Sequence, residues 1–226
     1  MIPRPANPLV VALDTASLEE ADGLAARLAP HVGMLKVGLE LAWAAGPEAA
    51  RRIARHAPVF VDAKLHDIPT TVARAAAAIG RLGPRMLTVH ALGGPAMMRA
   101  AVEGAREGAA AAGHASPLIV AVTVLSSQAD EFVPPVSLAW EAKEAGLDGV
   151  VVSGDDVGPV REACGEPFCL VVPGIRPASG DGDDQVRVLT PRRALEAGAD
   201  WLVVGRPITR SPDPVGAARA LLLEAG

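Results

Sequence analysis

Aromatic residues are scarce in this sequence of 226 residues, which has no tyrosine and an aromatic content of only 3%. This scarcity argues against surfaces that bind nucleic acid by base stacking and against aromatic-rich protein interfaces. Long blocks of like charge are also missing, and the formal net charge of −5 provides no positive footprint for nucleic acid or an anionic membrane. We therefore expect a small-molecule partner, with neither nucleic acid nor a membrane involved.

Cysteine and long apolar segments are scarce as well. Cys164 and Cys169 lie close together without the second pair that a metal site would need, and they form no disulfide framework. We interpret them as reduced thiols. Residues 1–8 lack the apolar stretch of a signal peptide, and no segment is long enough to span a bilayer. These absences predict a cytoplasmic protein.

Half of the residues are hydrophobic, which is enough for a sizeable core. Short apolar runs alternate with alanine-rich amphipathic stretches, a pattern typical of repeated βα units and a parallel sheet. The predicted strands are 9–13, 34–37, 59–61, 86–89, 118–124, 149–152, 168–172 and 201–204. The helix candidates include 17–28, 47–56, 71–82, 95–111, 138–145 and 191–197. This rhythm predicts an α/β fold, a single-domain (β/α)8 TIM barrel over residues 1–226, with its active site at the C-terminal ends of the strands.

Two of the predicted helices carry recognisable start signals. Ser17 can cap the first helix together with Glu20 three residues later, and Pro191 suits the first turn of its helix after Thr190. These signals support the predicted boundaries of the elements next to the strand ends.

The densest group of ionisable side chains follows the apolar run 58–61. Residues two apart in a strand face the same side, so Asp62 and Lys64 should project together and touch or nearly touch. Asp67 lies past the predicted strand end, where it can fold back on this pair or reach a neighbouring subunit. Such a cluster suggests catalysis, and a structural ion pair that ties the strand to its loop is the alternative.

Polar residues also end the other predicted strands, as an active site at that end of a barrel requires. They are Asp14, Lys36, His90, Thr123, Ser153, Pro173 to Arg176, and Gly205 with Arg206. Gly205 and Arg206 suit a phosphate, because the glycine N–H can approach closely and the guanidinium can grip two oxygens. The polar segment 178–185 is either a mobile lid, from which Arg176 and Gln185 could close over the same ligand, or a plain surface loop. We interpret His66 and His90 as packing residues.

Three motifs carry a resemblance to a known family: Asp62-Ala63-Lys64-Leu65-His66-Asp67-Ile68-Pro69, Val172-Pro173-Gly174-Ile175-Arg176-Pro177 and Val203-Val204-Gly205-Arg206-Pro207. Together with segments 13–14, 35–38, 123–125 and 182–185, they resemble the bacterial type of orotidine 5'-phosphate decarboxylase over nearly the whole chain. Thr70 departs from the asparagine that is frequent in the family, and Ser126 from the frequent threonine.

The resemblance implies decarboxylation of orotidine 5'-monophosphate to uridine 5'-monophosphate and CO2, the closing step of pyrimidine nucleotide synthesis, without a metal or an organic cofactor. Lys64 would protonate C6. The carbanion left at C6 keeps its lone pair in the ring plane, outside the ring π system, so fixed positive charge must stabilise it.

The same resemblance implies roles for the remaining site residues. Asp62 would lie near the substrate carboxylate within an alternating network of Lys36, Asp62, Lys64 and Asp67. The resemblance also implies that Asp67, Ile68 and Thr71 extend into the active site of the other subunit, so the protein would be a homodimer. Substrate contacts are implied for Asp14 and Lys36 at the ribose, Thr123 and Pro173 around the closed site, Gln185 between base and phosphate, and Arg176, Gly205 and Arg206 at the phosphate.

Two other functions stay open. A metal-dependent sugar-phosphate decarboxylase, such as 3-keto-L-gulonate 6-phosphate decarboxylase, is similar in its Asp-x-Lys-x-x-Asp strand, but it places an acidic metal ligand where this chain has Lys36. A non-catalytic nucleotide-binding barrel is the second alternative, and such a sensor would have little reason to keep Lys64.

Overall fold

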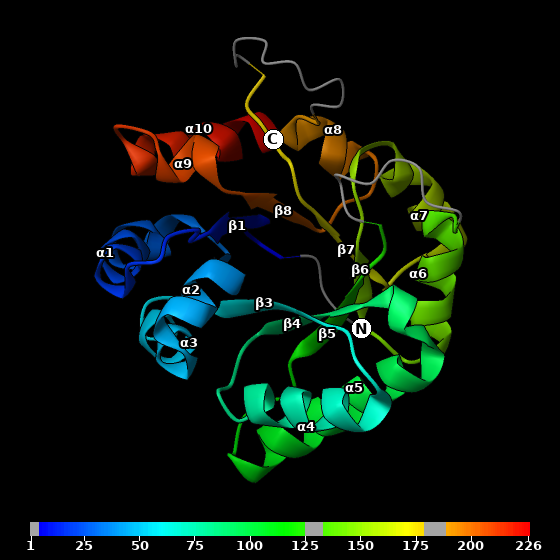
Figure 1. The fold of residues 1–226 in the computed structure, drawn as a ribbon. Coiled ribbons are helices and arrows are strands. Elements are labelled where there is room, and N and C mark those ends of the chain that lie inside the picture. Colours follow the sequence, from blue (N-terminus) through cyan, green and yellow to red (C-terminus); the bar gives the residue numbers. More distant parts are fainter. Residues whose placement is uncertain (1–4, 125–132, 179–188) are drawn as a thin grey trace.

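The computed structural model describes residues 5–124, 133–178 and 189–226. Eight parallel strands close into a barrel in which each strand pairs with the next and the last pairs with the first (Figure 1). The strands are β1 (Leu9–Ala12), β2 (Met34–Val37), β3 (Val59–Leu65), β4 (Met86–His90), β5 (Leu118–Val122), β6 (Gly149–Val151), β7 (Cys169–Val172) and β8 (Trp201–Val204). All eight predicted strands are present, so the predicted TIM barrel is confirmed.

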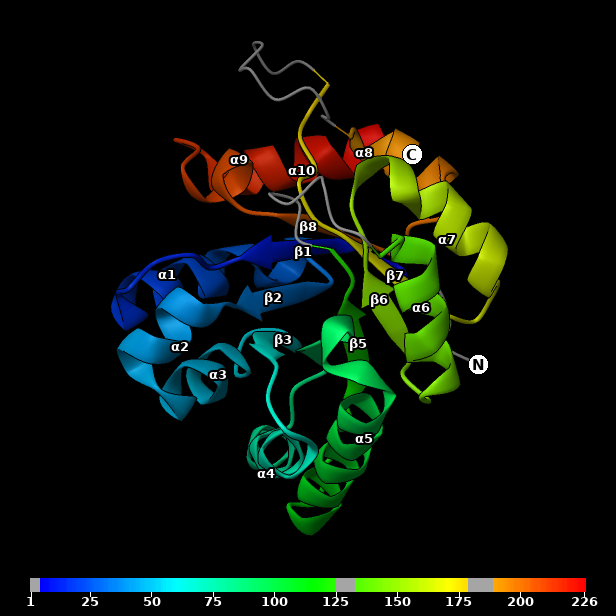
Figure 2. The ribbon, with the colours of Figure 1, turned by 45° about the vertical axis from the view of Figure 1, so that its right-hand side comes forward.

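Helices surround the barrel and connect consecutive strands (Figures 1 and 2). Those that match predicted ranges are α1 (Leu18–Leu28), α3 (Pro47–Ile53), α4 (Pro69–Gly80), α5 (Gly94–Ala111), α6 (Pro135–Glu144) and α8 (Pro191–Glu196). The structure adds α2 (Leu39–Ala45), α7 (Val157–Cys164), α9 (Arg206–Thr209) and α10 (Pro214–Ala225). Both predicted start signals are confirmed, because Ser17 accepts from the Glu20 N–H and Thr190 accepts from the Arg193 N–H.

The apolar residues form two layers, because side chains alternate between the faces of each strand. Val10, Met34, Phe60 and Met86 belong to a cluster in the barrel interior, and their strand neighbours Val11, Leu35 and Leu87 pack in the layer beneath the helices. On β2 and β3 the interior positions after Met34 and Phe60 are Lys36 and Asp62. The alternation therefore carries these two charged side chains into the C-terminal end of the barrel.

The described helices include no segment that is long and apolar enough to cross a membrane.

Candidate active site

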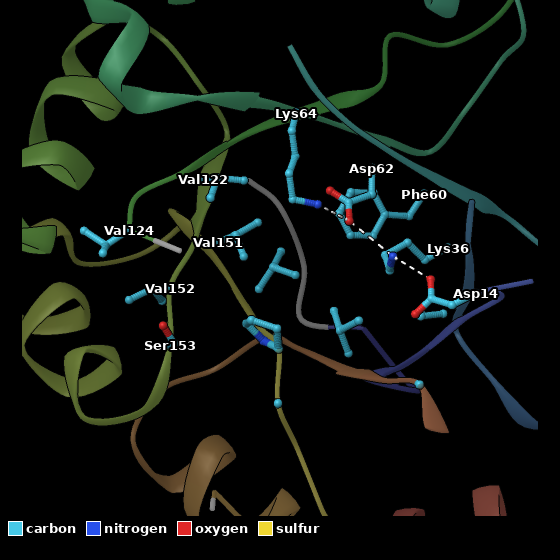
Figure 3. A pocket seen from close by; sticks show the side chains of 16 residues that line it. Asp14, Lys36, Phe60, Asp62, Lys64, Val122, Val124, Val151, Val152 and Ser153 are labelled. Atoms are coloured by element: carbon cyan, nitrogen blue, oxygen red, sulfur yellow. Dashed lines mark hydrogen bonds and ion pairs between the residues drawn. The ribbon is translucent and has the colours of Figure 1, made fainter. Parts of the chain in front are cut away.

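A cavity of about 300 Å³ opens at the C-terminal ends of the strands (Figure 3). One side is charged and carries Asp14, Lys36, Asp62 and Lys64. The opposite side is largely apolar, with Ser153 as its side-chain hydroxyl. The apolar lining consists of Ala12, Phe60, Val122, Val124, Val151, Val152, Val171, Pro173 and Val203, with Gly174 and Gly205 completing the wall. Such a cavity has the size and the mixed lining of a site for a small molecule with both ionic and flat apolar parts.

The charged side is a chain of ion pairs contributed by β2, β3 and Asp14, which lies two residues after the end of β1 (Figure 3). The Lys64 Nζ lies 2.6 Å from the Asp62 Oδ2, and the Lys36 Nζ lies 3.2 Å from the same oxygen. The Lys36 Nζ also lies 3.4 Å from the Asp14 Oδ1. The sequence contains three lysines, and two of them meet at one carboxylate oxygen. The contact predicted between Asp62 and Lys64 is confirmed.

Asp62 is ionised in this cluster although only 8% of its surface is exposed. Burial by itself would raise the pKa of its carboxyl, but the charges of Lys36 and Lys64 and the hydroxyl of Thr88 lower that pKa below its ordinary value. Because Asp62 keeps its negative charge, it can hold both ammonium groups in place at neutral pH.

The backbone of β3 is irregular where it presents this cluster. The sequence predicted a strand end at residue 61, whereas β3 continues to Leu65, with a register shift between Val61 and Leu65. Within the irregular stretch Lys64 has φ 48°, the one positive φ among the described non-glycine residues. That backbone conformation is sparsely populated for residues with a Cβ. The lysine is therefore presented by a strained bulge and not by a regular strand.

His66 and His90 lie beside the charged cluster. Their ring centroids are 5.4 Å apart with a tilt of 32°. The buried Nδ1 of His90 has no hydrogen-bond partner among the described residues. Burial, followed by the charges of His66 and Lys64, lowers the pKa of His90, so its ring is neutral near pH 7. His90 is half-buried, which fits the packing role predicted for it, whereas His66 is exposed and was wrongly interpreted as an interior packing residue.

The structure brings together only part of the predicted site. Pro173 and Gly205 line the cavity with the charged cluster. Thr123 is buried, and its hydroxyl donates to the carbonyl of Val151 at 3.0 Å. Arg206 is exposed at the start of α9.

Two further predicted residues belong to the stretch after β7. Arg176 follows a bridge between Ile175 and Leu189, and its N–H donates to the carbonyl of Leu189 at 3.2 Å. Gln185 lies outside the described residues, as does most of the predicted lid segment 178–185.

The residues predicted to serve a neighbouring subunit are not among those that line this cavity. Asp67, Ile68 and Thr71 are all exposed, and Ile68 has 65% of its surface accessible. Asp67 and Ile68 line a separate shallow depression with Leu92. Within the described chain, the ion pairs of Lys64 do not include Asp67.

Two residues next to the cluster were missed by the sequence analysis as contributors to the site. Thr88 is buried, and its hydroxyl donates to the Asp62 Oδ1 at 3.0 Å. Gly38 lies against Lys36, because a Cβ at that position would come within 2.9 Å of the Lys36 Nζ. The signal available for Thr88 was a polar residue inside the apolar run 86–89. The contact between position 38 and the Lys36 Nζ could not be predicted, because it arises only in the folded structure.

The described residues contain no group of three or more His, Cys, Asp or Glu side chains arranged to hold a metal ion.

Comparisons with known proteins were made over the whole chain. A family model described as "Orotidine 5'-phosphate decarboxylase / HUMPS family" matches residues 7–221. A protein named orotidine 5'-phosphate decarboxylase from Moorella thermoacetica is 50% identical, over 96% of this chain and 91% of its own length. One of the same name from Syntrophotalea carbinolica is 47% identical, over 96% of this chain and 93% of its own.

Solved structures give the same result. The crystal structure of orotidine 5'-phosphate decarboxylase from Lactobacillus acidophilus has a TM-score of 0.85 and 38% identity, covering 97% of this chain and 99% of that one. The corresponding enzyme from Pyrococcus horikoshii OT3 has a TM-score of 0.81 and 27% identity, covering 96% and 98%.

Proposed function

The chain belongs to the orotidine 5'-phosphate decarboxylase / HUMPS family, and from this membership we propose that it converts orotidine 5'-monophosphate to uridine 5'-monophosphate and CO2. This is the closing step of pyrimidine nucleotide synthesis. The observation that carries the proposal is the pair of lysine ammonium groups held on one buried carboxylate oxygen at the cavity wall. The relatives from Moorella thermoacetica and Syntrophotalea carbinolica that are named orotidine 5'-phosphate decarboxylase, at 50% and 47% identity, support the proposal.

The reaction needs fixed positive charge next to C6. When the bond between C6 and the carboxylate breaks, CO2 leaves and the electron pair stays on C6 in the ring plane. An ammonium about 4 Å away stabilises a unit negative charge by roughly 4 kcal/mol at an effective dielectric near 20. Lys64 supplies this charge, because Asp62 holds its Nζ at the cavity wall before substrate arrives.

Lys64 also supplies the proton. Its ammonium transfers H⁺ to the electron pair on C6, which completes uridine 5'-monophosphate, and the neutral amine then regains a proton from water. General acid catalysis of this kind contributes about 10²- to 10⁴-fold to a rate. Asp62 orients the donor, and Lys36 keeps that carboxylate charged when the neighbouring lysine becomes neutral.

The other site residues bind the ribose, the base and the phosphate of the substrate. Asp14 and Lys36 bind the ribose hydroxyls, and Thr123 and Pro173 enclose the base and ribose. Gly205, Arg206 and Arg176 bind the phosphate, and Gln185 links the phosphate to the base. In support, Gly205 lies at the end of β8, the region where phosphate sites recur in this fold.

We further propose that the protein works as a homodimer, with residues 1–226 as one barrel domain in each subunit. The exposed Ile68 and the neighbouring Asp67 and Thr71 reach the partner's cavity; in support, they are exposed and do not line the cavity of their own chain. A cytoplasmic location is part of the same proposal and is supported by the two free, buried thiols of Cys164 and Cys169.

A mixed dimer tests this shared site. Lys64→Ala and Asp67→Ala subunits with different affinity tags are co-expressed, and the dimer that carries both tags is isolated. One of its two sites then combines an intact Lys64 with an intact Asp67 from the other subunit, so we expect about half of the wild-type activity. Each variant alone should be nearly inactive. A mixed dimer as inactive as its parents would place both residues of a site in the same chain and contradict the proposal.

The activity itself is tested with metal removed. We expect purified, chelator-treated protein to cause a steady loss of the ultraviolet absorbance band of orotidine 5'-monophosphate. No change with folded protein would refute the assignment. Activity that depends on added magnesium and appears with a sugar phosphate would support the related metal-dependent decarboxylase instead.

A further inference from the structure

Thr88 is a polar side chain inside the barrel wall. It lies on β4 between Leu87 and Val89, and none of its surface is exposed. A buried hydroxyl needs hydrogen-bond partners to offset its loss of water. Thr88 finds both partners in the charged cluster and not in its own strand.

The two hydrogen bonds of the Thr88 hydroxyl run in opposite directions. The hydroxyl donates to the Asp62 Oδ1 at 3.0 Å and accepts from the Lys64 backbone N–H at 2.9 Å. Asp62 uses its other oxygen, Oδ2, for the ammonium groups of Lys36 and Lys64. One hydroxyl therefore connects the carboxylate that orients the lysine with the backbone from which the lysine side chain extends.

The backbone contact occurs where β3 is irregular. Lys64 has φ 48°, and the pairing of β3 with β4 shifts register between Val61 and Leu65. A strained conformation of this kind persists only where its surroundings hold it. The N–H of Lys64 points to the Thr88 side chain, so the hydroxyl replaces the backbone acceptor that a regular ladder would provide.

We propose that Thr88 is a positioning residue for decarboxylation, whose hydroxyl holds the bulged backbone of Lys64 and the carboxylate of Asp62 in register with each other. Thr88 does not line the cavity and so acts only through these two residues. The effect of Thr88 on catalysis rests on the proposed function. Its effect on the geometry of Asp62 and Lys64 rests on the hydrogen bonds alone.

The substitution Thr88→Val removes the hydroxyl and keeps the shape of the side chain. We expect kcat to fall by about 10- to 100-fold, the usual effect of losing a partner that orients a functional group. KM should stay within about 3-fold, because Thr88 makes no contact with bound substrate. Thr88→Ser keeps the hydroxyl and should restore most of kcat. If Thr88→Val does not fold, Thr88→Ala removes the same group with a smaller side chain.

A second measurement separates positioning from general support of the fold. The Thr88 hydroxyl helps to lower the pKa of Asp62, together with Lys36 from β2 and Lys64 from β3, while Asp14 faces Lys36 and the neutral His90 lies on β4. In Thr88→Val the Asp62 carboxyl should therefore titrate at higher pH than in wild type, and in Thr88→Ser at nearly the wild-type pH. Carboxyl-selective NMR titration measures this shift without substrate.

These readouts give distinct outcomes. The inference is overturned if folded Thr88→Val keeps the wild-type kcat and the wild-type Asp62 titration. It is also overturned if Thr88→Ser is as impaired as Thr88→Val, because retaining the hydroxyl would then not preserve the geometry of the site. A wild-type protein that does not decarboxylate orotidine 5'-monophosphate would refute the proposed function, and the NMR titration would still test the role of Thr88.

Discussion

Replacing Lys64 with alanine is expected to lower kcat/KM for orotidine 5'-monophosphate by at least about 10³-fold. The loss of a general acid contributes about 10²- to 10⁴-fold. The loss of a nearby positive charge adds about 4 kcal/mol, or roughly 10³-fold, and the two effects overlap because one group has both roles. Steady-state assays with enough enzyme to detect slow turnover measure the difference.

The variant should still fold, because the Lys36 Nζ remains 3.2 Å from Asp62 and the carboxylate keeps a partner. The chain also offers a matched control in Lys143, which lies on α6 and donates to the carbonyl of Cys164 at 2.7 Å. Lys143→Ala removes an ammonium outside the cavity and should leave kcat/KM unchanged. A folded Lys64→Ala variant with activity within about 10-fold of wild type would show that Lys64 is not the proton donor.

Replacing Asp62 with asparagine is expected to reduce both stability and activity. The amide leaves Lys36 and Lys64 without the negative charge that holds them together, and Lys36 has only 11% of its side chain exposed. Breaking a buried ion pair on one side costs about 3 to 5 kcal/mol, and the partial exposure of Lys64 favours the lower end, about 3 kcal/mol. The rate should fall by about 10²-fold because Lys64 loses its orientation.

The pH dependence of this stability difference has a definite sign. Because the pKa of Asp62 is lower in the folded protein than the ordinary value of 3.8, its charge stabilises the fold fully at pH values above 3.8. The contribution is lost only as the pH falls through the lower, folded pKa. The free energies of unfolding of wild type and Asp62→Asn, measured in urea, should therefore differ by a constant amount from about pH 8 to about pH 5.

A surface ion pair serves as the control for this experiment. Glu19 pairs with Arg52 at 3.7 Å and is largely exposed, so Glu19→Gln should leave the free energy of unfolding nearly unchanged. If the difference between wild type and Asp62→Asn disappeared between about pH 7 and about pH 5, a group other than Asp62 would be responsible for it.

The barrel follows from local sequence patterns. Each strand is a short apolar run such as Met34–Val37 or Trp201–Val204, and both were predicted with their observed bounds. The alternation of side chains also identifies which residues of β2 and β3 enter the barrel, so Lys36 and Asp62 could be recognised from the sequence. The helix α2 was not among the predicted helices; it directly follows β2 and Gly38, and Gly46 separates it from the predicted helix α3.

The geometry of the charged cluster depends on contacts between residues far apart in the sequence. By itself the sequence determined the (β/α)8 barrel, the strand ends that carry polar groups, and the pairing of Asp62 with Lys64, because all three depend on neighbours along the chain. The tertiary structure alone decided that β3 continues to Leu65 through a bulge and that Lys64 has a positive φ. The reason is physical: the Thr88 hydroxyl that accepts from the Lys64 N–H comes from the next strand, 24 residues away.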